Sequence, residues 1–452
     1  MTTKILPKIS NAHHRLSIGF SGAGFLGCYH LGVAECLVKN GLLLGPMDIP
    51  LTPSSCKPPA PIMLGASAGA ITAAAISAGV RAEDGMNVVF ELRRRVKSQG
   101  GVFDVLYPGV SLIDHVWELM LPVMQQALGN DDELLMRRIQ HGKLLRIALT
   151  HKQRFLASSS PLDMDDSASA DARKTGIATP VDVVKARTKQ FINKQSAQVS
   201  NSYLYVDSYR TIQDVASACI LSSYIPGLTG PARGVNDATN TGIRDATVKL
   251  LELLELGAVK DGKSDKALSM SDVLPSDTVD KASNASEKTE GGTTKVEERA
   301  TSLIEPFWDG GLSCIWPTVD DSTIIVCPIR AKYDPNPAIF PAINKNEEEN
   351  VIKTGAESRD GLSNVALAVE RKIKTMFAAS ASTGGTKRAS TSSSWSVPFH
   401  GKEVQLGIDN VETLMRMVIS SDEAILEEWF HRGYNDAKRF LKDSGMLQVY
   451  TS

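Results

Sequence analysis

Short apolar runs alternate with longer helical patterns along much of the chain. Apolar runs of strand length lie at 16–20, 61–64, 144–150, 203–209 and 322–329. Helical patterns follow the first two runs, over Gly27 to Asn40 and over the alanine-rich segment Ala68 to Ala78. Strands joined by helices in this way are typical of one sheet with covering helices. The sequence therefore predicts an α/β fold.

A different pattern occupies the segment from Asp409 to Ser444. Ser420 and Glu423 have the spacing of a capping box, which marks a helix start. Apolar side chains follow at three-to-four spacing, namely Ile425, Trp429, Phe430, Tyr434, Ala437 and Leu441. This predicts an amphipathic helix. Two interpretations stay open, a helix packed on the main domain or one that docks to a lipid or a partner.

Three stretches lose this periodicity and fill with Ser, Ala, Thr, Asp and Lys. They lie at 158–202, 261–300 and roughly 344–397. Long surface insertions cost little closure entropy, so we predict flexible insertions that leave the fold intact. The predicted organisation is listed here in chain order: an N-terminal extension 1–15, a main domain 16–330 with insertions at about 158–202 and 261–300, a mostly disordered linker 331–397, and a helical segment 398–452.

Composition and charge exclude several classes of protein. Of 452 residues, 42% are apolar and 22% charged, which predicts a soluble globular protein. Lys and Arg number 49 against 51 Asp and Glu, and no basic stripe is visible, so nucleic acid is not an expected partner. No apolar run reaches the roughly 18 residues of a membrane span. Six cysteines without a C-x-x-C spacing predict buried thiols and a reducing, cytoplasmic location.

The first glycine motif follows the run at 16–20. Gly22, Gly24 and Gly27 have the spacing G-x-G-x-x-G on a strand-to-helix turn. Such a turn offers backbone N–H groups to an anion, either a dinucleotide phosphate or another negative charge. The dinucleotide interpretation needs an acidic residue about twenty positions on, at the end of a second strand. Asp48 has the distance but lies in a proline-broken stretch.

The second motif is G-x-S-x-G, formed by Gly65, Ser67 and Gly69. An apolar run precedes it and a helix follows, which is the context of a nucleophile elbow. The small neighbours leave room for the hydroxyl, and the helix N-terminus offers free N–H groups where negative charge would develop. The helix is expected to end at Gly79.

A serine nucleophile needs a base, and the residues offer two kinds. His30, His115 and His151 would suit a Ser-His-Asp arrangement. Asp309, in the stretch FWDGGLS, would reach a cleft directly from a tight turn, although Asp-Gly is also a common turn dipeptide. Phe307 and Trp308 precede this carboxylate and would help to raise its pKa by excluding water.

Together, three motifs in this order resemble those of the patatin-like phospholipases. They are listed here by residue: Gly22, Gly24 and Gly27; Gly65, Ser67 and Gly69; Asp309, Gly310 and Gly311. The flanking stretches GFLGCYHLGVAECL, GASAGAITA, LRIALT and ASACILSSYIPGL are closer still to the adipose triglyceride lipase branch. The resemblance covers about 16–330, apart from the insertions.

The resemblance implies a three-layer α/β/α sandwich with a central, mostly parallel sheet and a catalytic dyad without histidine. Carried over, Ser67 would be the nucleophile and Asp309 the proton acceptor. Backbone N–H groups of Gly22, Ala23 and Gly24 would form the oxyanion hole. No metal or cofactor is implied. The expected substrates are glycerolipid acyl esters, reached from the surface of lipid droplets or membranes, with triacylglycerol hydrolysis as the expected activity and no activator protein identified.

Departures from the family pattern keep alternatives open. Relatives often continue the D-G-G motif with Asn-x-Pro, whereas this chain has Ile315 before Trp316 and Pro317. A phospholipase A or lysophospholipase, an acylglycerol transacylase and an inactive lipid-droplet scaffold are the alternatives. Two apolar segments, Val105 to Met124 and Cys219 to Leu228, are candidates for the rim of a lipid-binding cleft, and the first of them would equally fit core packing.

Overall fold

The structure is a computed structural model of the chain. It describes the residues listed here: 16–45, 61–100, 111–140, 143–151, 203–225, 228–230, 242–250, 307–342, 395–399, 402–406, 408–419 and 421–446. The predicted N-terminal extension, the insertions at 158–202 and 261–300, and most of the predicted linker lie outside them.

The strands are listed here with their bounds: β1 Ser17–Phe20, β2 Ile62–Gly65, β3 Leu145–His151, β4 Tyr203–Val206, β5 Phe307–Trp308, β6 Ile324–Val326, β7 Ala331–Lys332, β8 Ala338–Ile339, β9 Trp395–Phe399 and β10 Lys402–Leu406. The helices are listed likewise: η1 Gly24–Leu26, α1 Gly27–Lys39, α2 Ala68–Ala78, α3 Ala82–Gly100, α4 Leu112–Ala127, α5 Asp132–Leu135, the π-helical η3 Met136–Gln140, α9 Ile212–Ser222, η7 Gly310–Leu312, α14 Ile408–Val418 and α15 Glu423–Asp443. Residues 242–250 are also helical.

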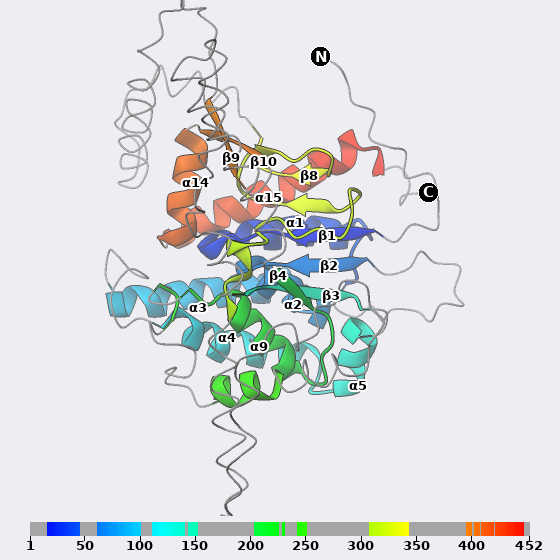
Figure 1. The fold of residues 1–452 in the computed structure, drawn as a ribbon, viewed down its shortest axis with the longest axis vertical. Helices are drawn as coiled ribbons and strands as arrows, with labels where there is room; N and C mark the ends of the chain where they lie inside the picture. Colours follow the sequence, from blue (N-terminus) through cyan, green and yellow to red (C-terminus); the bar gives the residue numbers. More distant parts are fainter. Residues whose placement is uncertain are drawn as a thin grey trace, which may run out of the picture.

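A seven-stranded sheet forms the centre of the described fold (Figure 1). Its strand order is β4-β3-β2-β1-β6-β8, and β5 pairs with β3 outside this path. β1, β2, β3, β6 and β8 run parallel, whereas β4 and β5 are antiparallel to β3. All five predicted apolar runs contain a strand, and the two predicted helices are α1 and α2. The prediction of an α/β fold with a mostly parallel central sheet is confirmed.

Alternate residues of each strand pack against different parts of the chain. Ile18 and Phe20 belong to the main core, which includes the alanines of α2. A side chain at Gly19 would point the other way, because its Cβ would overlap the carbonyl oxygen of Pro317. Ile325 on the same side clusters with Trp316. This cluster also includes Val404 of β10, and Met417 of α14 packs against it, while the three-layer arrangement stays a prediction.

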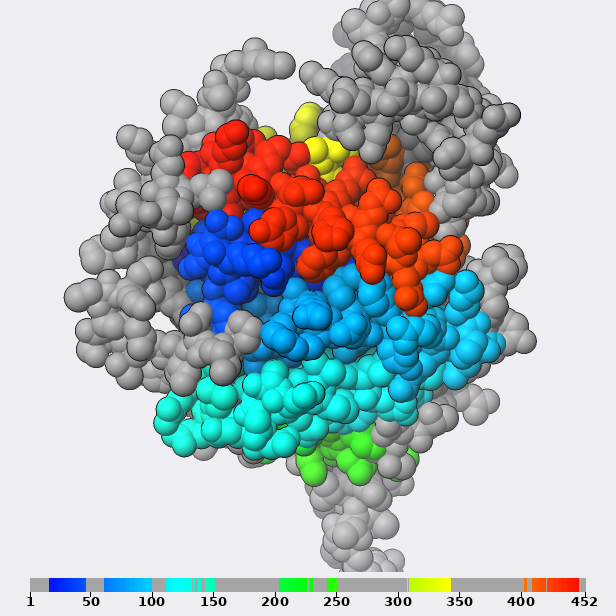
Figure 2. Space-filling view, turned by 180° about the vertical axis from the view of Figure 1, so that it is seen from behind, coloured from blue at the N-terminus to red at the C-terminus, as the bar shows by residue number. Residues whose placement is uncertain are grey.

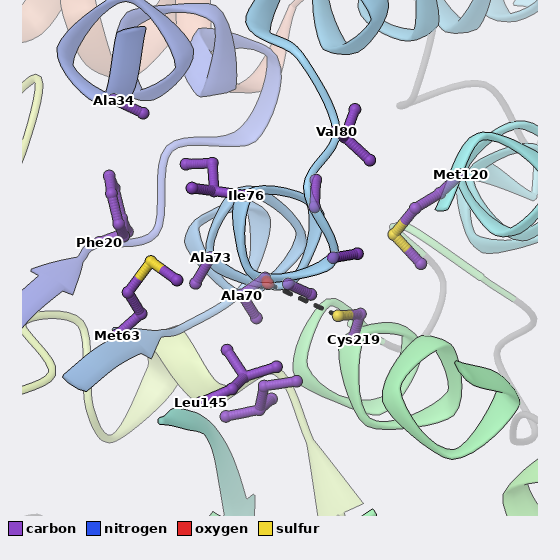
Figure 3. Close-up of a cluster of buried hydrophobic side chains, with 14 of the residues drawn as sticks. Phe20, Ala34, Met63, Ala70, Ala73, Ile76, Val80, Met120, Leu145 and Cys219 are labelled. Atoms are coloured by element: carbon purple, nitrogen blue, oxygen red, sulfur yellow. Dashed lines mark hydrogen bonds between the residues drawn. The ribbon is translucent and has the colours of Figure 1, made fainter. Parts of the chain in front are cut away.

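Small residues let α2 lie close to the sheet. Ala70 and Ala73 are fully buried between α2 and the strand residues Phe20, Met63 and Leu145 (Figure 3). Beside these strand contacts, the thiol of Cys219 in α9 donates a hydrogen bond to the Ala70 carbonyl oxygen over 3.5 Å (Figure 3). The start of α2 is therefore held between the sheet and α9.

The C-terminal segment packs on the domain, as one of the two interpretations predicted, but it forms two helices, α14 and α15. In Figures 1 and 2 the red α15 lies against the blue α1. Gly32 and Gly433 permit this contact, since a Cβ on either would overlap a backbone oxygen of the other helix. Tyr29 adds a hydrogen bond of 3.1 Å to the Asp436 carboxylate.

The predicted capping box is wrong. Helix α15 begins at Glu423 with Asp422 as its N-cap, so Glu423 cannot be the third helical residue of a helix capped at Ser420, which itself lies outside the described residues. The acidic side chains serve another purpose. Asp422 and Glu423 form ion pairs with Arg93 and Arg94 of α3, which join the start of α15 to α3.

The predicted boundary of the main domain at residue 330 is also wrong. Residues 331–342, assigned to a mostly disordered linker, contain β7 and β8, and β8 pairs with β6 in the central sheet. β7 instead pairs with β10 in a second, three-stranded sheet with β9. Residues 343–394 of that predicted linker lie outside the described residues.

The two predicted rim segments contribute to the core where they are described. Ile113, Val116, Trp117 and Met120 of α4 are buried, which favours the core interpretation of that segment. Five cysteines, listed here, are buried free thiols, as predicted: Cys28, Cys36, Cys219, Cys314 and Cys327. Within the described residues, no helix combines the length and the apolar composition that a bilayer crossing requires.

Candidate active site

The two glycine motifs meet because β1 and β2 are parallel neighbours. Phe20 at the end of β1 pairs in register with Gly65 at the end of β2. The loops that leave these strands therefore start side by side at the carboxyl edge of the sheet. A Cβ built on Gly22 would lie 3.7 Å from the Cβ of Ser67, and Gly27, at the start of α1, faces Ala68 of α2. The first motif thus borders the second.

Ser67 lies on a sharp turn between β2 and α2, as predicted for a nucleophile elbow. Its φ of 55° and ψ of −131° are a backbone conformation that side-chain-bearing residues rarely adopt. A non-glycine residue held in this way costs on the order of 1–3 kcal/mol. Gly65 and Gly69 are required here, because a Cβ on Gly65 would lie 2.4 Å from Ala70 and one on Gly69 would lie 2.2 Å from Phe20. The turn presents a half-buried serine at a helix N-terminus.

Asp309 is positioned by contacts with β3 and with the loop after α9. β5 pairs antiparallel with the end of β3, and Asp309 follows directly. The Asp309 amide donates to the carbonyl oxygen of Tyr224 over 2.8 Å, and the Asp309 carbonyl oxygen accepts a hydrogen bond from Thr150. Gly310 is packed so closely that a Cβ there would lie 2.0 Å from the Ala148 carbonyl oxygen.

These two loops bring the predicted pair into contact across 242 positions of sequence. The Ser67 hydroxyl donates a hydrogen bond of 2.6 Å to Oδ2 of Asp309. The other carboxylate oxygen, Oδ1, accepts a hydrogen bond of 2.6 Å from the Gly311 amide. Because each carboxylate oxygen accepts one hydrogen bond, the carboxylate is held with Oδ2 facing the serine hydroxyl.

Burial makes the Asp309 carboxylate unusually basic. Only 3% of the residue is exposed, and desolvation raises its pKa from 3.8 to about 7. The hydrogen bonds from Ser67 and Gly311 oppose this shift, and no cation of the described part of the chain contributes to it. Phe307, fully buried beside Asp309 in the chain, fits the expected apolar surroundings. A pKa near neutrality is the range in which a general base works best.

The loop at 22–24 leaves backbone donors available beside the serine. Among the described residues, none accepts a hydrogen bond from the amides of Gly22, Ala23 or Gly24. Gly24 has a φ of 52° and is exposed, and η1 begins there. Its α-carbon is pressed against α14, since a Cβ would lie 1.9 Å from the carbonyl oxygen of Met417. Gly22 lies next to Ser67, and the amides of this loop remain candidates for the predicted oxyanion hole.

No described histidine side chain is hydrogen-bonded to Ser67. His30 is completely buried in α1 against the ring of Phe20, and desolvation lowers its pKa to about 3. His115 forms a hydrogen bond of 3.1 Å with Gln99. The side chain of His151 and the residue Asp48 lie outside the description. The geometry therefore favours Asp309 as the base.

Sequence reasoning missed one residue of the site, Ser222, at the end of α9. Its hydroxyl oxygen accepts a hydrogen bond of 2.9 Å from the Ser67 amide and donates one of 2.7 Å to the Ala148 carbonyl oxygen. The signal in the sequence is the stretch Cys219 to Leu228, which contains Ser222 and for which the motif pattern predicts a cleft wall. Ile315, the departure from the family pattern, also lies here, since a Cβ on Gly22 would be 3.9 Å from its side chain.

The described residues contain no group of three or more metal-ligating side chains that could hold an ion. Comparison with known proteins adds no relative: no family model matches the chain, and neither does a curated protein or a solved structure. What the site can do therefore has to be inferred from its own residues and geometry.

Proposed function

We propose that this protein is a carboxylic ester hydrolase that uses a Ser67–Asp309 dyad to cleave acyl esters of glycerolipids. The observation that carries the proposal is the 2.6 Å hydrogen bond from the Ser67 hydroxyl to the Asp309 carboxylate, made by a serine on a strained strand-to-helix turn. A strained conformation that tertiary contacts maintain is characteristic of functional sites.

In the first half-reaction the Ser67 Oγ attacks the acyl carbonyl carbon, and its proton passes to Oδ2 of Asp309. The carbonyl oxygen becomes an oxyanion that the amides of the loop at 22–24 stabilise. When the tetrahedral intermediate collapses, the bond from carbon to the alcohol oxygen breaks, and Asp309 returns its proton to the leaving alkoxide. The acyl group is now esterified to Ser67.

In the second half-reaction water attacks the acyl-enzyme carbonyl, and Asp309 accepts the proton of the water. Collapse of the second intermediate releases the carboxylic acid and returns the proton to Ser67. If an acylglycerol hydroxyl replaces water, the same steps transfer the acyl group to that alcohol. Oxyanion donors typically contribute about 3–4 kcal/mol each to the transition state, so the loop matters nearly as much as the dyad.

The glycerolipid substrate class and the three-layer patatin-like architecture rest on the resemblance of the three ordered motifs. The same resemblance supports action at a lipid droplet or membrane surface, as a peripheral protein, and triacylglycerol as the first substrate to test. Phospholipids are the alternative substrate, and acyl transfer is the alternative reaction.

A matched pair of variants tests the proposal. Ser67→Ala removes the reactive hydroxyl, whereas Ser77→Ala removes a buried hydroxyl of the same helix that bonds only within the core. Purified protein is incubated with triolein micelles, with phosphatidylcholine vesicles and with a fluorophosphonate probe that modifies activated serines. We expect the wild type and Ser77→Ala to release fatty acid and to bind the probe, and Ser67→Ala to do neither.

Two results would contradict the proposal. Equal acid release by the wild type and Ser67→Ala would remove this serine from the reaction. Absence of both acid release and probe labelling in the wild type would favour the inactive scaffold. Release from vesicles alone would instead keep the dyad and change the substrate to a phospholipid.

A further inference from the structure

Ser222 is a fully buried hydroxyl at the point where three parts of the candidate site converge. We propose that Ser222 is a positioning residue, which holds the backbone of the nucleophile in its strained turn and fixes the D-G-G loop at the same point. This inference rests on the proposed esterase function and adds a residue that acts through Ser67, without contact with the substrate.

The hydrogen bonds of Ser222 have a fixed direction. Its single hydroxyl proton is donated to the carbonyl oxygen of Ala148 in β3, over 2.7 Å. The lone pairs of the same oxygen accordingly face the Ser67 amide, which donates to it over 2.9 Å. The hydroxyl thus connects the turn after β2 to the neighbouring strand β3 through one atom.

This connection opposes the relaxation of the strained turn. The peptide that carries the Ser67 amide would have to rotate for Ser67 to leave its φ of 55°. Rotation would break the bond to Ser222 and leave the Ser67 amide without this acceptor, while Ser222 would keep its own bond to the Ala148 carbonyl oxygen. Leaving a buried amide unsatisfied has a cost comparable to the strain itself.

The Ser222 hydroxyl oxygen also restricts the position of the loop that carries Asp309. A Cβ on Gly310 would lie 2.0 Å from the Ala148 carbonyl oxygen and 2.8 Å from the Ser222 hydroxyl oxygen. The residue after Asp309 therefore packs directly on the pair that Ser222 bonds together. One hydroxyl consequently sets the relative position of the nucleophile turn and the base loop.

The test compares Ser222→Ala with Ser217→Ala. Ser217 lies in the same helix, is equally buried, and bonds only to the Gln213 carbonyl oxygen one turn earlier. We measure kcat and KM on p-nitrophenyl butyrate across pH, the rate of labelling by a fluorophosphonate, and thermal unfolding. Misplacement of reacting groups by a fraction of an ångström to an ångström costs up to about 100-fold in rate.

For Ser222→Ala we expect kcat to fall about 10- to 100-fold, KM to stay within about twofold, and labelling to slow in parallel. The pH midpoint of kcat should rise, because the hydrogen bond from Ser67 lowers the pKa of Asp309 and this bond would be weakened. Ser217→Ala should change none of these. Ser222→Cys keeps a similar volume and a weak hydrogen-bond donor, so it should stay folded and have an intermediate kcat. This variant replaces Ser222→Ala in the test if the alanine variant does not fold.

The inference is overturned if folded Ser222→Ala, or Ser222→Cys in its place, retains the kcat and pH midpoint of Ser217→Ala. It is also overturned if activity is lost only in proportion to the unfolded fraction. A wild type that neither hydrolyses the ester nor binds the probe marks a different failure, that of the esterase function itself.

Discussion

Two buried carboxylates of this protein have opposite surroundings. Desolvation raises the pKa of both Asp309 and Asp436. At Asp436 in α15, neighbouring groups oppose the upward pKa shift. Arg439 lies 3.0 Å from the carboxylate, and the Tyr29 hydroxyl and the Ala342 amide donate hydrogen bonds to it. Asp309 receives hydrogen bonds from Ser67 and Gly311, and among the described residues no cation is a cause of its pKa shift.

The difference separates a carboxylate that holds the fold together from one that is left reactive. Near Asp436 a positive charge favours the ionised form, and the group joins α15 to α1. Near Asp309 desolvation outweighs the two hydrogen bonds and raises the pKa to about 7, at a cost in stability. Perturbed carboxylates of the second kind cluster at functional sites. Five predictions test these surroundings and the turn at Ser67.

The largest effect is expected from Asp309→Asn. The amide has the shape of the carboxylate, and it can donate to the Ser67 hydroxyl while it accepts from the Gly311 amide, so the fold should survive. It cannot take a proton, and we expect ester hydrolysis to fall by at least about 1,000-fold. Initial rates and circular dichroism measure both points. Turnover at the wild-type level would assign the base role to a histidine instead.

The pH dependence of the wild type should report Asp309 directly. With a pKa of about 7, the base is active only when ionised, so the rate should rise through a midpoint near pH 7. At pH 5 it should be about 100-fold below the plateau. A midpoint near pH 4, measured with a soluble ester, would show that the carboxylate is hydrated and in its ordinary range.

The raised pKa of Asp309 also makes the stability of the fold depend on pH. Because the folded-state pKa of Asp309 is raised, its contribution to stability is complete below the unfolded pKa of about 4 and is lost as the pH rises through about 7. Asp309→Asn removes this loss. The variant should therefore gain stability over the wild type at pH 8 and gain little at pH 4, as read from urea unfolding.

Asp436→Asn should behave in the opposite way. It leaves Arg439 and the buried Tyr29 hydroxyl with a weaker partner, so we expect a loss of about 1–3 kcal/mol in the free energy of unfolding. The kcat of the folded protein should be unchanged. Chemical denaturation and initial rates test this, and a loss of kcat at full folding would contradict the structural role.

The smallest effect concerns the strain at Ser67. Both Ser67→Ala and Ser67→Gly remove the hydroxyl, but only glycine adopts a φ of 55° without steric cost. We expect the glycine variant to be more stable than the alanine variant by about 1 kcal/mol. Equal unfolding midpoints for the two inactive variants would mean that the turn stores no such strain.

The site was largely predictable because its residue types are demanded by local geometry. A serine between two glycines after an apolar run, and an aspartate before two glycines, each describe a turn whose shape depends on those residues. The elements β1, α1, β2 and α2 followed from periodicity for the same reason. The motifs therefore identified both Ser67 and Asp309 before their contact was seen.

What the sequence did not reveal depends on partners distant in the chain. Ser222 differs from any helical serine only through its bonds to Ser67 and Ala148. β8 is two residues long, and its place beside β6 is a matter of pairing alone. The break between α14 and α15 coincides with ion pairs to α3, which no local pattern encodes.

The contact between Gly24 and Met417 has a consequence for how this protein could be engineered. Helix α14 supplies a wall against which the loop at 22–24 rests, so under the proposed function it would help to shape the site although it lies almost four hundred positions downstream. A shortened version that stops after the central sheet would keep both reactive side chains and still lose the surface that shapes the loop. Minimal versions for screening or crystallisation should retain the chain through α15.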